Sequence, residues 1–360
     1  MSLWMIIAIV GCTIVLCDFW YHQYASKRIQ GIIESVMPVG ATLSQPDNSA
    51  TLLSIPTSDG LKLSGSLYHP ATKSPGLVVF LPELNSDHWT AVTYAQALMS
   101  AGFAVLSFDF RGQGNSDSQN GYEPSHWITE FELTDIGSVL AFIDDDPKLS
   151  QLPLGMMGVS RGGSAAMLAA CRYPQVAAVV TDSGFTTMEM IHSFLDKFSR
   201  VIIPDWVFSR LPTWHVNRTL RTSLARSEKS RACRYVLLKP ELATHTQQPV
   251  LLISGDRDSY VTPAVTRTIA AALGQEDNVW IVNKAKHNRS RTKCPNEYDQ
   301  RIVQHFSNAF AEAADSHADA TRQLPNPQLR HSHCDGGSFR STAGKHHPGT
   351  DVAGSPVSGH

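Results

Sequence analysis

Short runs of consecutive apolar residues alternate with helix-like segments along the middle of the chain. The runs are LVVF, FAVLSFDF, PLGMMGVS, AAVV, PVLLIS and VWIVN, and helical patterns such as 91–100, 127–143 and 161–172 separate the earlier ones. A strand that is apolar at every position is buried on both faces, which is typical of a parallel sheet covered by helices. Residues 51–57 and 61–70 precede the runs as two strand patterns joined by a Ser-Asp-Gly turn, which predicts an antiparallel hairpin. The sequence therefore predicts the α/β class, with a mainly parallel sheet and helices on both faces.

Composition narrows the function classes. The 360 residues are 42% hydrophobic and 17% charged, which is enough apolar material for a full core. The formal net charge of -2 gives no overall attraction to nucleic acid, so we expect no nucleic-acid partner. The six cysteines lack the close pairing of zinc sites, and we expect no metal and no organic cofactor.

An apolar run occupies residues 3–21 and contains one charged residue, Asp18. Its length is close to the roughly 20 residues needed to cross a bilayer, so it predicts a membrane anchor. A cleaved signal peptide is the alternative, although no basic segment precedes the run, and Ile9-Val10-Gly11-Cys12 faintly resembles a lipobox. Because Lys27 and Arg28 follow the run, the positive-inside tendency would place the body of the protein in the cytoplasm. We assign residues 1–28 to the anchor and its flank and residues 29–50 to a linker.

Two later regions lack the strand and helix alternation. Residues 186–246 predict a helical insertion, or cap, in a domain that spans 51–314, and the polar residues 315–360 predict a disordered tail. Between residues 191 and 240 the chain has ten Lys/Arg against three Asp/Glu, with aromatic and apolar residues among them: Trp206, Phe208, Leu211 and Trp214. This mixture suits a lipid interface or the cover of an acyl pocket, and it also suits a cap whose aromatic side chains pack downward.

The motif Gly158-Val159-Ser160-Arg161-Gly162 lies between an apolar strand and a helical pattern. A serine at such a sharp turn is presented as a nucleophile, and glycines flank it because strand and helix approach closely there. The start of the helix also offers unpaired backbone N–H groups to developing negative charge. Ser160 is therefore the candidate nucleophile.

A serine hydroxyl needs a histidine to take its proton and a carboxylate to orient that histidine. Asp256 and Asp258 follow the strand PVLLISG, and His287 follows the strand VWIVN. Both positions lie past the C-terminal ends of predicted parallel strands, at the edge where such sheets bind ligands. The order serine, acid, histidine is the one that this type of fold uses.

With these motifs the chain resembles the α/β-hydrolase superfamily, in its serine-aminopeptidase and monoglyceride-lipase-like branch with Bem46-like membrane-anchored relatives. The resemblance covers about residues 51–313 and also includes Asp109-Phe110-Arg111-Gly112-Gln113-Gly114. It implies an α/β-hydrolase fold with a helical cap. It also implies that Asp258 rather than Asp256 is the catalytic acid, with Asp182 as the alternative, and that Asp109 and Arg111 form a structural pair.

The segment after the first parallel strand departs from the family pattern. Relatives have His-Gly where this chain has Pro82-Glu83. The resemblance implies that the backbone N–H groups of Leu84 and Arg161 bind the oxyanion. A carboxylate beside an oxyanion would oppose it, so Glu83 must point away, pair with a cation, or indicate an altered site. The Arg161 side chain is expected to pair with Glu83 or Asp182, or to meet an anionic group of the substrate.

The sequence thus predicts a serine hydrolase that cleaves a small acyl ester, as a carboxylesterase or lipase-like enzyme, through an acyl-enzyme on Ser160. His287 would act as base and then acid, and Asp258 would orient it. An aminopeptidase or amidase is the second enzyme reading. The alternative from a different functional class is a catalytically weak, membrane-tethered binding or scaffold protein. Glu83 is the feature that supports this hypothesis. We also expect the protein to contact a membrane through the N-terminal anchor and through the cap.

Overall fold

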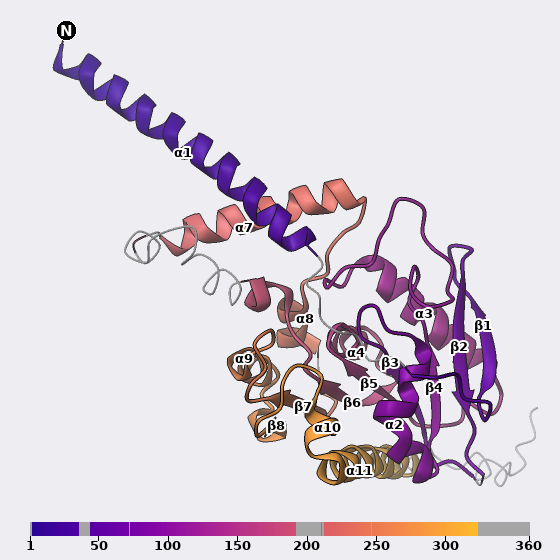
Figure 1. Ribbon diagram of the computed structural model, residues 1–360. Coiled ribbons are helices and arrows are strands. Elements are labelled where there is room, and N and C mark those ends of the chain that lie inside the picture. Colours follow the sequence, from indigo (N-terminus) through magenta and orange to yellow (C-terminus); the bar gives the residue numbers. More distant parts are fainter. Residues whose placement is uncertain are drawn as a thin grey trace, which may run out of the picture. The chain divides into compact units, whose positions relative to one another are not determined.

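The computed structural model describes residues 2–35, 44–71, 73–191, 210, 212–245 and 247–322. Within these residues the chain forms an eight-stranded sheet in the order β1-β2-β4-β3-β5-β6-β7-β8 (Figure 1). Strand β2 is antiparallel to both β1 and β4, and the pairs from β4 to β8 are parallel. The strands are β1 Thr51–Pro56, β2 Lys62–Tyr68, β3 Leu77–Leu81, β4 Ala104–Phe108, β5 Leu154–Val159, β6 Val176–Asp182, β7 Val250–Gly255 and β8 Val279–Val282. The predicted hairpin and mainly parallel sheet are confirmed.

Two apolar clusters, one on each face, bury the sheet. In β3, Leu77, Val79 and Leu81 enter one cluster while Val78 and Phe80 enter the other, because successive side chains of a strand point to opposite faces. The first cluster lies under the helices α3 Glu130–Asp145, α4 Arg161–Arg172, α8 Leu238–His245 and α9 Pro263–Leu273. The second lies under α2 Ala91–Ser100 and α11 Pro295–Arg322, and α10 Ser290–Lys293 and two short 3-10 helices, His88–Thr90 and Glu276–Asn278, complete the described elements. Burial on both faces explains why the strands are apolar at every position.

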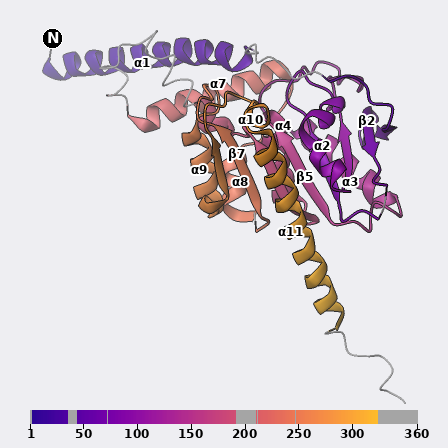
Figure 2. The same cartoon turned by 60° about the horizontal axis from the view of Figure 1, so that its bottom comes forward.

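The N-terminal helix α1, Leu3–Glu34, has two parts with different surroundings. Residues 3–17 are all exposed, and the helix is long and apolar enough to cross a membrane. From Asp18 onward the helix packs against α7, Thr213–Arg231, and buries His22, Ser26 and Ile33. Figures 1 and 2 both show α1 and α7 side by side. The helix therefore runs past the apolar segment that predicted it, because a second, mostly polar face has its own packing partner.

The predicted boundaries fall on these elements as follows. Residues 29–34 of the predicted linker are the last turns of α1, and the Ile33 carbonyl accepts a hydrogen bond of 2.9 Å from Trp127 Nε1. The range of the predicted cap contains α7 and α8 between β6 and β7. Trp206, Phe208 and Leu211 lie outside the described residues, as do residues 323–360 of the predicted tail. Helix α11 continues to Arg322, beyond residue 314.

A buried ion-pair cluster joins the hairpin to α3. The Arg111 side chain is fully buried and lies 2.6 Å from Asp135 and 2.7 Å from Asp59. Asp109 instead accepts hydrogen bonds from the backbone N–H groups of His88 and Asn115. The expected Asp109–Arg111 pair is therefore wrong. A buried guanidinium has five N–H groups, so Arg111 needs more acceptors than Asp109 could supply. The backbone N–H groups in the loop around Asp109 need an acceptor, and the Asp109 carboxylate is that acceptor.

Replacing Arg111 with Met should lower the free energy of unfolding by about 3–5 kcal/mol, because Asp135 would remain as a buried, uncompensated charge. The matched control is Arg172→Met, which removes a partly exposed pair with Glu241 and should cost about 1 kcal/mol or less. Urea unfolding of the full chain in mild detergent measures both changes. Equal, small losses in the two variants would contradict a structural role for the Arg111 cluster.

Candidate active site

Ser160 sits between β5 and α4 with a left-handed backbone, at φ 51° and ψ -117°. A Cβ on Gly158 would lie 2.2 Å from the Gly162 carbonyl oxygen, and a Cβ on Gly162 would lie 2.0 Å from that of Leu81. Both contacts are far too short, so only glycine allows strand and helix to approach this closely. A non-glycine residue held in this conformation is strained, and such strain is typical of functional sites. The sequence motif thus forms the sharp turn that presents the Ser160 hydroxyl.

Three side chains from three strand ends form one hydrogen-bonded chain. The Ser160 Oγ is 3.0 Å from His287 Nε2, and His287 Nδ1 is 2.7 Å from Asp258 Oδ2. The other oxygen of Asp258 accepts hydrogen bonds from the backbone N–H groups of Tyr260, at 2.8 Å, and Val261, at 2.9 Å. All three side chains are buried, and the two backbone donors hold the Asp258 carboxylate in place. In this arrangement His287 can accept a proton from Ser160 while its other nitrogen faces a carboxylate.

The two other acids considered for this chain lie elsewhere. Asp256 is exposed. Asp182 is fully buried and accepts hydrogen bonds from Ser290, at 2.9 Å, and Ser183, at 3.1 Å. Burial raises the pKa of Asp182 to about 6 in spite of these donors. Its backbone carbonyl accepts the Ser160 N–H at 2.7 Å, so Asp182 supports the turn from behind.

The predicted oxyanion donors lie on two neighbouring segments. Leu81 of β3 is the register partner of Gly158 in β5, and Gly162 lies against the Leu81 and Pro82 carbonyls. The loop that carries Leu84 therefore starts beside the first turn of α4, where Arg161 follows the serine. This adjacency is what two backbone donors to one oxygen atom require. The donor roles of Leu84 and Arg161 stay predictions.

Glu83 is buried, and the side-chain amide of Asn288 donates a hydrogen bond to it. Asn288 directly follows His287 and has a left-handed backbone, at φ 54°. Its own N–H donates to Ser183 at 3.4 Å, and its carbonyl accepts from Tyr94 at 3.2 Å. Glu83 therefore ties the loop after β3 to the histidine loop. None of the three expectations for Glu83 named an amide as its partner.

The Arg161 side chain is fully buried and pairs with Glu132 of α3, at 2.6 Å, rather than with Glu83 or Asp182. Glu132 also accepts hydrogen bonds from Tyr122, at 2.6 Å, and from the Thr129 N–H, at 2.7 Å, which begins α3. The Arg161 guanidinium lies over the Phe110 ring, 5.3 Å from its centroid. A cation at a helix N-terminus is unfavourable, and this network offsets that cost. The positive charge of Arg161 contacts a carboxylate on one side and the face of an aromatic ring on the other. The sequence predicted an ion pair for Arg161, but it did not identify Glu132 as the partner.

His126 lies near this site, and the sequence motifs did not single it out. It is buried, and burial together with the electrostatic influence of nearby Arg161 and His287 lowers its pKa to about 4. His126 is therefore neutral at physiological pH. Its neighbours in sequence, Ser125 and Trp127, gave no signal that would have separated it from a loop residue.

The part of the chain that the structure describes contains no group of three or more His, Cys, Asp or Glu side chains that could hold a metal ion. Ser160, His287 and Asp258 form a hydrogen-bonded chain of hydroxyl, imidazole and carboxylate. The chemistry open to this arrangement is proton transfer and nucleophilic attack by an oxygen atom.

Comparison with known proteins agrees with the fold. Residues 72–236 match the sequence model of the family described as serine aminopeptidase, S33. An esterase from Pyrococcus furiosus superposes with a TM-score of 0.55 at 19% identity, covering 77% of this chain and 98% of that protein. The crystal structure of a membrane phospholipase A, described as a bacterial virulence factor, superposes with a TM-score of 0.50 at 17% identity, covering 85% of this chain and 97% of that protein.

Among curated proteins, a thiohydrolase from Aspergillus aculeatus is 29% identical over 126 residues, which cover 35% of this chain and 38% of that protein. An uncharacterized 31.7 kDa protein from Escherichia coli is 29% identical over 98 residues, which cover 27% of this chain and 33% of that protein. The matched segments thus span little more than a third of these relatives. The superposed structures show an α/β-hydrolase fold, and the family model matches the part of the chain between residues 72 and 236.

The lowered pKa of His126 predicts a pH dependence of stability. Its pKa of about 4 in the folded protein lies below the ordinary value of 6.5, so the unfolded chain binds more protons between these two values. The contribution of His126 to the free energy of unfolding should be fully present above pH 6.5. It should decrease as the pH approaches 4, by up to about 3 kcal/mol in total. His126→Gln should flatten that fall. Urea titrations of wild type and variant across pH 4 to 7 measure the difference, and parallel curves would contradict it.

Proposed function

We propose that the protein is a serine hydrolase that cleaves an ester through an acyl-enzyme on Ser160. The observation that carries the proposal is the chain of two hydrogen bonds that joins Ser160, His287 and Asp258. A serine at a strained turn, a histidine within 3.0 Å and a carboxylate held by two backbone donors are the parts that acyl transfer needs. The match to a hydrolase family supports the same class of reaction.

The chemical steps follow from this geometry. His287 Nε2 takes the Ser160 proton as the oxygen attacks the ester carbonyl, and Asp258 stabilises the imidazolium through Nδ1. Backbone N–H groups of Leu84 and Arg161 hold the resulting oxyanion. His287 then gives its proton to the leaving alcohol, and the same steps with water release the acid. General acid and base catalysis of this kind contributes roughly 10²- to 10⁴-fold.

The carboxylates that the structure describes near the site favour an ester over a peptide with a free amino terminus. A bound ammonium group would need a carboxylate that is not already engaged. Glu83 accepts from Asn288, Glu132 pairs with Arg161, and Asp182 is fully buried behind Ser160. The hydrogen bond of Glu83 to Asn288 also supports an active enzyme over a scaffold, because it gives that carboxylate a partner within the hydrolase framework.

The N-terminal helix supports attachment to a membrane as part of this proposal. Residues 3–17 of α1 are exposed along their whole circumference and are almost entirely apolar, which is unfavourable in water and favourable in lipid. The protein would then act on substrates at a membrane surface, with its body on the cytoplasmic side as Lys27 and Arg28 predict.

Fluorophosphonate labelling tests the nucleophile. Wild type should form one covalent adduct, and Ser160→Ala should lose it completely because, among the described serines, Ser160 is the one that contacts His287. Ser164→Ala is the matched control: it removes a buried hydroxyl one helical turn later, which contacts the backbone of Phe185, and should keep the label. Circular dichroism verifies that each variant is folded.

Hydrolysis of p-nitrophenyl esters of increasing chain length then measures turnover. Asp258→Asn should lower kcat by about 10⁴-fold, since the amide would favour the wrong tautomer of His287. Failure of folded wild type to react with the fluorophosphonate would remove the basis for the proposed enzyme. Labelling that survives in Ser160→Ala would assign the nucleophile to another residue.

A further inference from the structure

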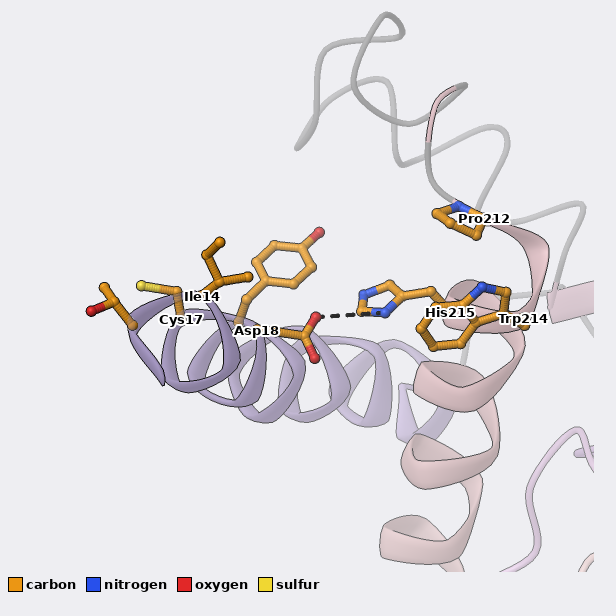
Figure 3. Close-up of a pocket in the computed structure, with 8 residues that line it drawn as sticks. Ile14, Cys17, Asp18, Pro212, Trp214 and His215 are labelled. Carbon is orange, nitrogen blue, oxygen red and sulfur yellow. Dashed lines mark ion pairs between the residues drawn. The ribbon is translucent and has the colours of Figure 1, made fainter. Parts of the chain in front are cut away.

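An open groove of about 550 Å³ lies between α1 and the beginning of α7. Its walls are mostly apolar and include Ile14, Cys17 and Tyr21 of α1 and Pro212, Trp214 and His215 of the other side. Figure 3 shows Asp18 of α1 pointing toward His215, which lies beside Trp214. The groove belongs to neither the proposed catalytic chain nor the sheet.

A polar cluster closes one end of this groove and explains the single charge in the apolar run. Asp18 lies 3.7 Å from His215 Nδ1 and 4.0 Å from Arg218 (Figure 3 draws the first of these). One turn further, the ring nitrogens of His22 lie 3.0 Å from the Thr219 hydroxyl and 3.1 Å from that of Thr222. A carboxylate at the end of a membrane segment is costly unless it has a partner, and α7 supplies partners here.

These contacts fix the direction and the level of α7. Asp18 meets His215, His22 meets Thr219, and Glu34 meets Ser230, so the two helices run in the same direction. The start of α7 therefore lies beside residues 14–18, inside the apolar run. At about 1.5 Å per residue, Ile14 precedes Tyr21 by roughly 10 Å along the helix.

The side chains at this level are those found at the boundary of a bilayer. Trp214 is 64% exposed, and Trp20 on α1 is 69% exposed. Tryptophan and tyrosine gather where hydrocarbon meets the lipid head groups, and arginine just beyond them reaches lipid phosphates. Arg218, one turn after Trp214, is half-exposed, and its guanidinium lies 4.0 Å from Asp18.

We propose that this groove binds a phospholipid of the bilayer, with an acyl chain along Ile14 and Cys17 and its phosphate near Arg218. The proposal rests on the membrane attachment in the proposed function and is independent of the catalytic chemistry. The occupant follows from the lining: one wall is the apolar face of the helix that would lie in the bilayer, and the polar end carries a cation. The predicted cap would thereby be held at the membrane surface at the start of α7.

Photocrosslinking of the full chain in vesicles tests the groove. The probe is phosphatidylcholine with a diazirine in one acyl chain, and mass spectrometry maps the modified peptides. Wild type should be modified both on α1 and on the peptide that contains Pro212 and Trp214. Ile14→Trp fills the groove and should lose the modification on the second peptide, while Leu16→Trp, at nearly the same depth on the opposite side of α1, should keep it.

Each other outcome has a defined meaning. Modification of α1 alone in wild type would overturn the groove proposal and leave the anchor in place. An unmodified α1 would overturn the anchor itself, and with it the groove. Equal loss in Ile14→Trp and Leu16→Trp would show a general effect of bulk and contradict a specific site. Fluorophosphonate labelling of the same samples reports separately on Ser160.

Discussion

The close contact of backbone with backbone at the end of β5 is the constraint on which the rest of the site depends. Gly158 and Gly162 bring the strand, the first turn of α4 and the end of β3 within distances that no Cβ could occupy. This contact forces Ser160 into a left-handed conformation, where a non-glycine residue is strained by about 1–3 kcal/mol. The parallel sheet and the apolar clusters on both of its faces supply the stability that maintains this strain.

A layer of buried charge surrounds the turn and holds its neighbours in register. Arg161 with Glu132 fixes α4 to α3, Glu83 with Asn288 fixes the loop after β3 to the histidine loop, and Asp182 accepts hydrogen bonds from two serines behind Ser160. Buried polar groups are costly unless their hydrogen bonds are made, so such a network favours one arrangement over others. The loops that carry His287 and Leu84 are thereby joined to each other. The Glu83 carboxylate, which the sequence suggested would oppose an oxyanion, connects these two loops.

The sheet, the sharp turn at Ser160 and the order of Ser160, Asp258 and His287 could be predicted. Each of them follows from a local pattern in the sequence. Continuous apolar runs indicate buried strands, and polar residues just past them fall on one edge of a parallel sheet. The partners of the buried charges could not be predicted, because they depend on contacts far apart in sequence. Glu83 and Asn288 are separated by 205 residues, and His22 and Thr219 by 197. The length of α1 beyond its apolar run has the same origin, since its polar face is stabilised by α7 and not by its own sequence.

The acyl-enzyme is the central claim, and its direct observation is the most decisive measurement. The full chain is mixed with a short-chain p-nitrophenyl ester, acid-quenched at successive times and examined by intact and peptide mass spectrometry. The proposed mechanism predicts an increase of one acyl group, located on the peptide that contains Ser160, which decays at the rate of turnover. Turnover without this adduct, or an adduct on another residue, would contradict the assignment of Ser160 as the nucleophile.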